Sequence, residues 1–307
     1  MNPQPLSSKH HTTGPLPVGV LLFSATLWGL SWWPVKQLVG LGLTGALLPM
    51  LAYGTVALFT GWVLWQERAQ WRGQAGLLLG LAFVGGWANT AFVSALMVGD
   101  VVRVMFLFYL SPVWSVLGGR LFLGERIPPL RAAAVVVAVV GLWLVITGGH
   151  APQSVSLTWA DALALTAGLG FAGNNIIARA AQQIPLRSKT VAVFVGCGVL
   201  SALAAAWQGA PLTGLPAMAW IGVVLYGGVW LLLATATWQF GVTHIESGRA
   251  GVILLAELLV AVLTASWWGG ESLSAVEWMG GALIAFAALL ETLDPGPRPL
   301  ALTKEPT

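Results

Sequence analysis

The chain has 307 residues, of which 57% are hydrophobic and only 8% are charged. A soluble domain carries about 25% charged residues, so this composition excludes a large water-facing surface and indicates a membrane protein. The net charge of +3 is too small and too dispersed for a nucleic-acid-binding protein. The one cysteine, Cys197, excludes an internal disulfide framework and a cysteine-rich metal site.

The apolar runs predict an all-α membrane protein with ten transmembrane helices. Polar tails, residues 1–17 and 294–307, flank the spans, and both are predicted to be disordered and cytoplasmic. Pro34 and the glycines of residues 40–45 indicate that the first span is broken or mobile near its outer end. The predicted spans cover residues 18–38, 43–65, 74–96, 101–122, 130–148, 159–180, 189–208, 217–241, 247–268 and 275–293.

One stretch occurs twice, as residues 100–146 and 246–292. Each copy reads as an acid, an arginine, a long apolar run, a Gly-Glu pair and a second apolar run. A period near half of the chain indicates duplication of a large unit, here two repeats of five helices over residues 18–148 and 159–293. Because five is an odd number, the repeats are predicted to enter the membrane in opposite directions, with a site near the midplane between them.

The basic residues predict the orientation of the chain. With the N-terminus in the cytoplasm, twelve of the 14 Lys and Arg residues lie on the cytoplasmic side, and only Lys36 and Arg103 lie on the other. This is a strong positive-inside bias. Residues 1–17 are polar, so no cleavable signal is evident. We expect a multi-pass protein of the bacterial inner membrane with both termini cytoplasmic.

Two pairs of motifs mark the fourth span of each repeat. The first repeat carries Leu110-Ser111-Pro112-Val113 and then Gly124-Glu125-Arg126, and the second carries Ala256-Glu257-Leu258-Leu259 and then Gly270-Glu271. In this order the motifs resemble the EamA-type exporters of the drug/metabolite transporter superfamily. The resemblance implies a basket of ten helices around a central cavity, lined mainly by the first, third, fourth, sixth, eighth and ninth helices. It also implies export or facilitated flux of small metabolites, amino acids among them. Leu258 stands where the family usually has proline, which leaves the helix kink expected there open.

Glu257 lies near the middle of the ninth span. An ionisable group at this depth costs a few kcal/mol, so it is expected to face the bundle interior or a water-filled cavity. It is interpreted as a proton-coupling carboxylate or as a partner for a substrate ammonium group. The alternative is a neutral carboxyl that hydrogen-bonds to a neighbouring helix.

Two acid–arginine pairs open the fourth and ninth spans, and they lie at opposite membrane faces in the predicted topology. Asp100 and Arg103 form the first pair, and Glu246 and Arg249 the second; each pair is spaced i, i+3 on one helix face. They are interpreted either as helix caps with an interfacial salt bridge or as gates of the cavity. Structural turn roles are predicted for Pro112, Glu125 and Glu271.

Other polar and aromatic residues within the spans are candidates for lining the cavity. Tryptophan rings could stack on an aromatic or cationic ligand. The adjacent asparagines of the sixth span, flanked by small residues, are the best polar candidates. The alternative for any of these residues is packing, lipid contact or hydrogen bonding between helices. The candidates are Trp28, Trp32, Trp87, Asn89, Thr90, Tyr109, Trp114, Asn174, Asn175 and Trp238.

These features favour a secondary transporter that exports a small organic solute, an amino acid or a related metabolite, by alternating access. An uncoupled facilitator is the first alternative; an intramembrane lipid-modifying enzyme and a non-transporting scaffold are the others. The sequence has no Walker A string and no histidine cluster, so an ATPase and a metal-dependent enzyme are not favoured. The expected partners are a small-molecule substrate, the lipid bilayer and protons, with no nucleic acid and no cofactor. The expected assembly is a monomer or a homodimer.

Overall fold

The structure is a computed structural model that describes residues 15–123, 127, 129–148, 157–210, 212–245 and 247–293. The described residues form helices joined by short loops, with no strand among them. Within them, six segments are long and apolar enough to cross a membrane: Pro15–Gly40, Leu47–Gln66, Arg68–Val98, Val101–Gly118, Leu186–Trp207 and Ala217–Gly241. Three further apolar helices are shorter: Ala132–Thr147, Leu255–Trp267 and Ala275–Leu290. The chain is therefore a multi-pass, helical membrane protein.

The helices of the first half follow the predicted spans closely. α1 begins three residues before the predicted span at residue 18, so the tail ends earlier than expected. The elements are α1 (Pro15–Gly29), α2 (Trp32–Gly40), α3 (Leu47–Thr60), α4 (Trp62–Gln66), α5 (Arg68–Trp71), the 3-10 turn η1 (Arg72–Gln74), α6 (Ala75–Val98), α7 (Val101–Phe108), α8 (Ser111–Leu123) and α9 (Pro129–Thr147).

The second half is equally helical. A short π-helical stretch, η3, interrupts the helix between α12 and α13. The elements are α10 (Trp159–Ala180), α11 (Leu186–Trp207), α12 (Ala217–Leu225), η3 (Tyr226–Leu231), α13 (Leu232–His244), α14 (Ser247–Trp267) and α15 (Ala275–Leu293).

Proline breaks two of the apolar segments, the first between α1 and α2 and the second between α7 and α8, whereas α14 is unbroken. The first is interrupted at residues 30–31, because the ring nitrogen of Pro34 cannot donate to the Leu30 carbonyl four residues earlier. The break between α7 and α8 has the same cause, since Pro112 cannot donate to Phe108. α14 runs unbroken through Leu258, which replaces the proline usual in the family. Without a proline at this position, every residue of α14 keeps a backbone N–H group that can donate within the helix.

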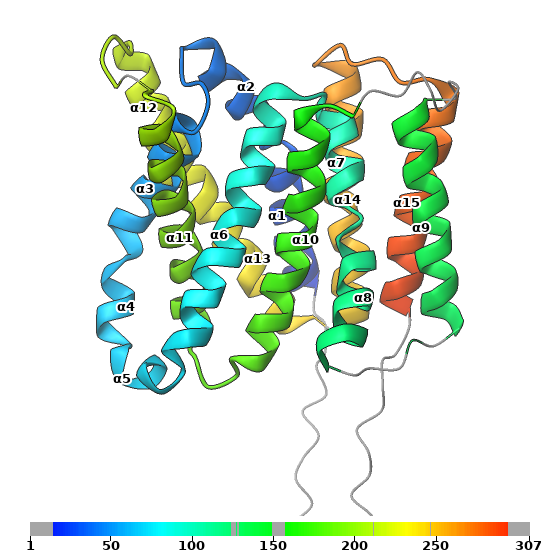
Figure 1. Ribbon diagram of the computed structural model, residues 1–307, viewed down its shortest axis with the longest axis horizontal. Helices are drawn as coiled ribbons and strands as arrows, with labels where there is room; N and C mark the ends of the chain where they lie inside the picture. The colour runs from blue at the N-terminus through cyan, green and yellow to red at the C-terminus, as the bar shows by residue number, and fades with distance from the viewer. Residues whose placement is uncertain are drawn as a thin grey trace, which may run out of the picture.

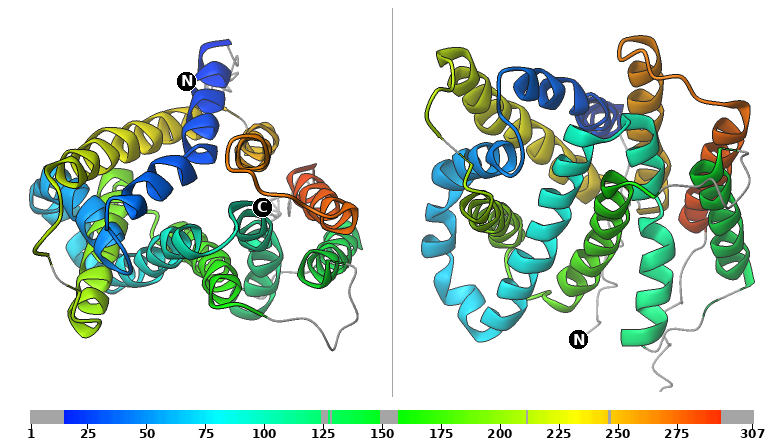
Figure 2. Two further views of the ribbon diagram at one scale, coloured as in Figure 1. Left: turned by 90° about the horizontal axis from the view of Figure 1, so that it is seen from above. Right: turned by 45° about the horizontal axis from the view of Figure 1, so that its top comes forward.

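The long helices stand side by side, and successive ones run in alternating directions (Figure 1). α2, the junction of α6 with α7, the start of α10 and the end of α14 lie at one end of the bundle, called the upper end below (Figure 1). α6 packs against α10 and α11, and α1 packs between α13 and α14. Figure 2 gives the same arrangement from above, with α9 and α15 paired at one edge. Gly141 and Gly280 allow this pairing, because a Cβ on either would lie 2.6 Å from the carbonyl oxygen of the other.

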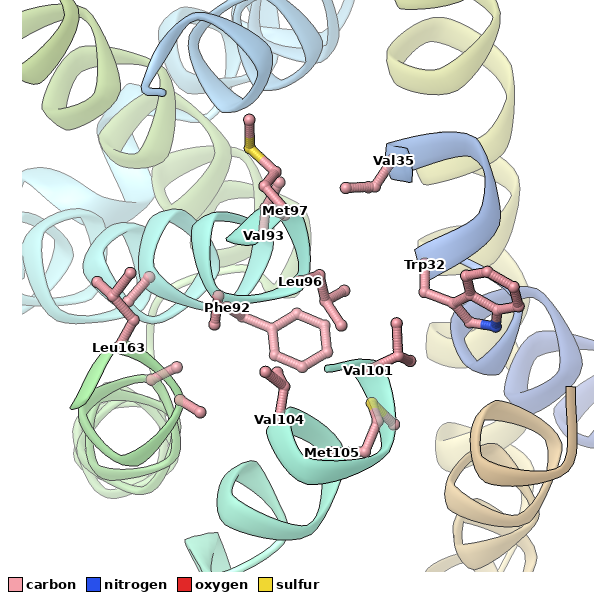
Figure 3. Close-up of a cluster of buried hydrophobic side chains, with 14 of the residues drawn as sticks. Trp32, Val35, Phe92, Val93, Leu96, Met97, Val101, Val104, Met105 and Leu163 are labelled. Atoms are coloured by element: carbon pink, nitrogen blue, oxygen red, sulfur yellow. The ribbon is translucent and has the colours of Figure 1, made fainter. Parts of the chain in front are cut away.

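Buried apolar side chains fill the space between the helices at the upper end. α2, α6, α7 and α10 each contribute to this packing (Figure 3). We call this group the apolar plug: Trp32, Val35, Phe92, Val93, Leu96, Met97, Val101, Val104, Met105 and Leu163. These side chains are buried and belong to one apolar core cluster, so helices at the upper end of the bundle pack through apolar side chains.

Candidate functional site

The site is built around Glu257, which sits at the middle of α14. It lies ten residues from Ser247 and ten from Trp267 (257 − 247 = 267 − 257 = 10), or about 15 Å from either end at 1.5 Å per residue. Its exposed fraction is 7%. A helix of this length matches the ~30 Å thickness of a hydrocarbon layer, so a residue at its middle is the farthest from both helix ends. Glu257 is therefore buried in the helix bundle at the depth that the sequence predicts.

Tyr109 is the described side-chain partner of Glu257. Its hydroxyl donates a hydrogen bond to the carboxyl group of Glu257. Tyr109 itself occupies the break between α7 and α8, where the backbone turns before Pro112. The partner is neutral, so the negative charge of an ionised Glu257 is solvated by a hydroxyl rather than balanced by a cation. A buried carboxylate in this state favours a proton or a cationic ligand.

α1 lies directly against the backbone of Glu257. A Cβ at Gly29 would lie 2.6 Å from the Glu257 carbonyl oxygen and 2.9 Å from the Cβ of Val260, so only glycine fits here. One turn further along, the Trp32 indole donates to the hydroxyl of Thr264 at 3.0 Å. Trp32 therefore fastens α2 to α14, two turns above Glu257, and this hydrogen bond gives it a packing role in the described conformation.

An aromatic cluster extends from Tyr109 across three helices. The Phe108 ring lies 5.9 Å from Tyr109, 4.6 Å from Phe92 and 5.5 Å from Phe171, centroid to centroid. The candidate list from the sequence, which favours tryptophan, omits these three phenylalanines. The run Phe106-Leu107-Phe108-Tyr109 directly before Ser111-Pro112 was the available signal. Tyr109 thus lies at the end of a chain of ring contacts that includes Phe108, Phe92 and Phe171.

Several buried polar atoms lack a hydrogen-bond partner among the described residues. Two of them belong to predicted candidates on α1 and α8, the indole nitrogens of Trp28 and Trp114. A third is the Oδ1 atom of Asn174 on α10, and a fourth is the hydroxyl of Thr235 on α13. Buried donors and acceptors are normally satisfied, so such groups can bind polar atoms of a ligand or water. Asn174 lies close to Gly85, in the seam between α6 and α10.

Two other predicted candidates join helices to one another. Asn89 accepts from the Tyr53 hydroxyl at 2.9 Å and donates to the Gly85 carbonyl at 2.9 Å. Thr90 hydrogen-bonds to Ser201 at 3.1 Å and contacts the Cys197 sulfur at 3.3 Å. Both fit the alternative interpretation of hydrogen bonding between helices.

The remaining candidates of this group are less enclosed. Trp87 is 40% exposed on α6, so much of its ring faces outward. Asn175 on α10 and Trp238 on α13 are half-buried. Trp28 and Trp114 are half-buried as well, so burial separates these three residues from Glu257 alone.

The charged residues at the upper end pair differently from the prediction. Arg103 forms a two-pronged salt bridge with Asp161 of α10, at 2.6 and 2.9 Å, and not with Asp100. Asp100 makes no side-chain cap for α7. The i, i+3 interpretation is wrong for this pair because Asp161, 1% exposed, brings a carboxylate from another helix. The sequence analysis omits Asp161, although Thr158 and Asp161 form a capping box that was readable as Thr-x-x-Asp.

Glu271 does more than brace its own turn. Its two carboxylate oxygens accept from the backbone N–H groups of Val101 at 2.7 Å and Val102 at 2.9 Å, at the start of α7. Glu125, which corresponds to Glu271 in the first repeat, lies outside the described residues. The same holds for Glu246 and the side chain of Arg249, the second predicted acid–arginine pair.

Pro112 lines a small apolar crevice next to the Glu257 site. The crevice lies between α8, α9 and α15, and Tyr109 is one of its lining residues. Its lining is Tyr109, Pro112, Val113, Val116, Ala134, Val135, Ala138, Ile284, Ala287 and Ala288. Among the described residues, no three His, Cys, Asp or Glu side chains gather into a metal site.

Comparison with known proteins relates this geometry to a family. The model of the EamA-like transporter family matches residues 16–147 and again residues 158–293. An uncharacterised transporter of Archaeoglobus fulgidus is 24% identical over 69% of this chain and 75% of its own length. A riboflavin transporter of Rhizobium johnstonii is 26% identical over 71% of this chain and 69% of its own length. An uncharacterised inner membrane transporter of Escherichia coli is 23% identical over 59% of this chain and 58% of its own length.

A solved crystal structure supports the fold. It superposes on this chain with a TM-score of 0.59 and covers 91% of this chain and 96% of its own, at 19% sequence identity. At that identity the likeness concerns the fold alone. The relatives are named as transporters, which indicates membrane transport of a small solute rather than an enzymatic activity. With the family model matching most of its length in two adjacent segments, the chain belongs to the EamA-like transporter family of the drug/metabolite transporter superfamily.

Proposed function

We propose that this protein exports a small organic solute, an amino acid or a related metabolite, across the inner membrane by alternating access. The observation that carries the proposal is the Glu257–Tyr109 pair. It is a buried carboxyl at the middle of the bundle whose described side-chain partner is neutral. Such a group costs stability in a membrane, and the cost is offset by a function that needs a negative charge there.

The proposal includes a ten-span fold made of two inverted repeats, residues 18–148 and 159–293, around a central cavity. The duplicated stretch supports it, as does the family model that matches each half separately. The 146-residue shift (246 − 100) also relates Trp28 to Asn174 (28 + 146 = 174), and both carry a buried polar atom without a described partner. A binding site between two repeats would be expected to have unpaired polar groups at corresponding positions of corresponding helices.

The proposed orientation places both termini in the cytoplasm and the upper end outside. The distribution of basic residues supports it, because Lys36 and Arg103 belong to the upper end, whereas the other Lys and Arg residues fall in the tails, loops and helix ends assigned to the opposite side. We further propose that the apolar plug closes the upper end in the described conformation, which its burial supports. The solute would then enter the site from the cytoplasmic side.

In the proposed mechanism, Glu257 binds either a proton or the ammonium group of the solute, but not both. The Tyr109 hydroxyl orients the carboxyl in either state, and the indoles of Trp28 and Trp114 contact the rest of the solute. Because the two ligands exclude one another, inward movement of a proton can drive outward movement of the solute. An uncoupled facilitator would use the same site without the exchange.

The proposal is tested by efflux from proteoliposomes that hold the purified protein. Labelled amino acids are loaded individually, and their release is followed with and without an inward proton gradient. We expect saturable release of at least one amino acid, faster with the gradient. A failure to release any amino acid, together with normal incorporation of the protein, would contradict the substrate assignment.

A second candidate substrate is a neutral, flat heterocycle. The riboflavin transporter of Rhizobium johnstonii, at 26% identity, favours it, as do two buried indole N–H groups without described partners. Riboflavin is therefore included in the same efflux assay. Release of riboflavin but of no amino acid would favour this candidate.

A further inference from the structure

A single carboxylate joins the two halves of the chain at the upper end. Glu271 lies in the loop between α14 and α15, and it accepts hydrogen bonds from Val101 and Val102, 170 and 169 residues away. The first N–H groups of a helix have no partner within the helix and normally bind a local cap. Asp100, the residue placed to supply that cap, makes no side-chain hydrogen bond to α7. The cap of α7 is therefore supplied by the opposite half of the chain.

Neighbouring residues make further polar contacts at the upper end, and these contacts together are called the polar layer. Arg103 binds Asp161 of α10 at 2.6 and 2.9 Å, and the Lys36 ammonium donates to the Gly99 carbonyl at 2.8 Å. These contacts connect α2, α6, α7 and α10 with one another. Of the contacts in this layer, the Glu271 bonds are the ones that bring in the loop after α14.

We propose that Glu271 is a latch residue, whose carboxylate holds the loop after α14 on the start of α7 and keeps the upper mouth closed. This inference rests on the proposed alternating access, in which the halves must separate at the upper end. Two properties of the loop suit a reversible contact. Gly270 has a φ of 70°, a backbone conformation that glycine adopts without strain, and it lies directly before Glu271. The carboxylate also binds backbone amides, so the latch can open without leaving a charged partner unpaired.

The test measures access to the apolar plug from outside. Cys197 is replaced by serine, and Val104→Cys, a near-isosteric change at a buried plug position, serves as the reporter. Intact cells are treated with a membrane-impermeant maleimide, and the labelling rate is measured. Glu271→Gln is expected to raise this rate about tenfold or more, since a hydrogen bond to a charged group contributes roughly a factor of ten or more. Glu271→Asp, which keeps the charge, is expected to restore part of the low rate.

A matched control lies six residues after Glu271, in the first turn of α15. Glu277 caps its own helix through Ser274, at 2.8 and 2.9 Å, and its described hydrogen bonds stay within the second half. Glu277→Gln is therefore expected to leave the labelling rate within about twofold of the parent, because no bond between halves is lost.

A second variant tests the latch without changing Glu271. Val101→Pro removes one of the two donated N–H groups at the first helical position, where proline is well tolerated, and Asp100 before it is already extended. Because Val101 belongs to the apolar plug, the labelling rate is compared with that of Val101→Ala, which shortens the same side chain but keeps the N–H group. Val101→Pro is expected to raise the labelling rate as well. Unchanged labelling in both Glu271→Gln and Val101→Pro, with normal chromatographic behaviour, would overturn the latch. Should the efflux assay detect no solute while these rates rise, the latch would stand and the proposed substrate class would fail.

Discussion

At the scale of single residues, the structure replaces a lone carboxyl with a pair. Glu257 comes from the second half of the chain and Tyr109 from the first, so their hydrogen bond crosses between the proposed repeats. The two residues lie at nearly corresponding positions of the two repeats. The 146-residue shift aligns Glu257 with Ser111, which is two residues after Tyr109 (111 + 146 = 257). The carboxyl is thus present in one repeat only, and the hydroxyl that orients it comes from the other.

This pairing predicts the effect of removing one oxygen atom. Tyr109→Phe leaves the ring in contact with Phe108 but deprives Glu257 of its described side-chain partner. Solute efflux is expected to fall about tenfold, because a hydrogen bond to a charged group is worth about 1.5–3 kcal/mol. Proteoliposome efflux measures the loss.

Tyr53→Phe is the matched control for that variant. It removes a buried hydroxyl that donates to Asn89 at 2.9 Å, away from Glu257. Its expected cost is about 1–3 kcal/mol of unfolding free energy, with efflux per folded molecule unchanged. Equal losses of efflux in the two variants would mean that Tyr109 acts only through stability.

At the scale of helices, the fourth span of the first repeat is broken, whereas the corresponding span of the second repeat is one continuous helix. α7 and α8 are separated by a break that Pro112 enforces, and this break lets Tyr109 reach toward α14. α14 is continuous, which places Glu257 at a fixed depth and angle. α1 fixes α14 from the other side through the close contact at Gly29. A rigid helix thus carries the charge and a broken helix carries its partner.

Two glycines on α1 allow this arrangement to be tested. Gly29→Ala would place a methyl group 2.6 Å from the Glu257 carbonyl oxygen, a backbone atom that cannot rotate away. It is expected to destabilise the protein by about 1–3 kcal/mol and to disturb transport. Gly19→Ala, on the same helix, meets nothing within 4 Å and is expected to leave stability unchanged or to raise it by about 0.5–1 kcal/mol. Thermal unfolding in detergent compares them, and similar shifts would contradict the described α1–α14 contact.

At the scale of the whole molecule, the proposed topology predicts which loops face the cell exterior. Thr213 lies in the exposed upper loop between α11 and α12, and Gln70 is exposed in α5 at the opposite end. In a Cys197→Ser background, Thr213→Cys should react with an impermeant maleimide in intact cells. Gln70→Cys should react only after permeabilisation. The reverse pattern would invert the orientation and, with it, the inference that the apolar plug faces outward.

How well the sequence predicts a feature depends on how far apart in the chain the interacting residues lie. Local signals predicted the helices well: the sixth span matches α10 at both ends, and Pro34 and Pro112 account for the breaks. Burial of Glu257 followed from its position in an apolar run. Its partners did not, because Tyr109, Asp161 and the α7 amides are brought together by packing of helices distant in sequence. Charge spacing alone therefore paired Arg103 with the wrong carboxylate.

The central claim is that Glu257 couples solute export to proton entry. Its most direct test is efflux from proteoliposomes under an imposed inward proton gradient, comparing the parent with Glu257→Gln and with the helix-cap control Glu277→Gln. We predict that the gradient accelerates efflux in the parent and in Glu277→Gln, whereas Glu257→Gln, which cannot release a proton, shows the same rate with and without it. Gradient-driven efflux that survives in Glu257→Gln would contradict the account.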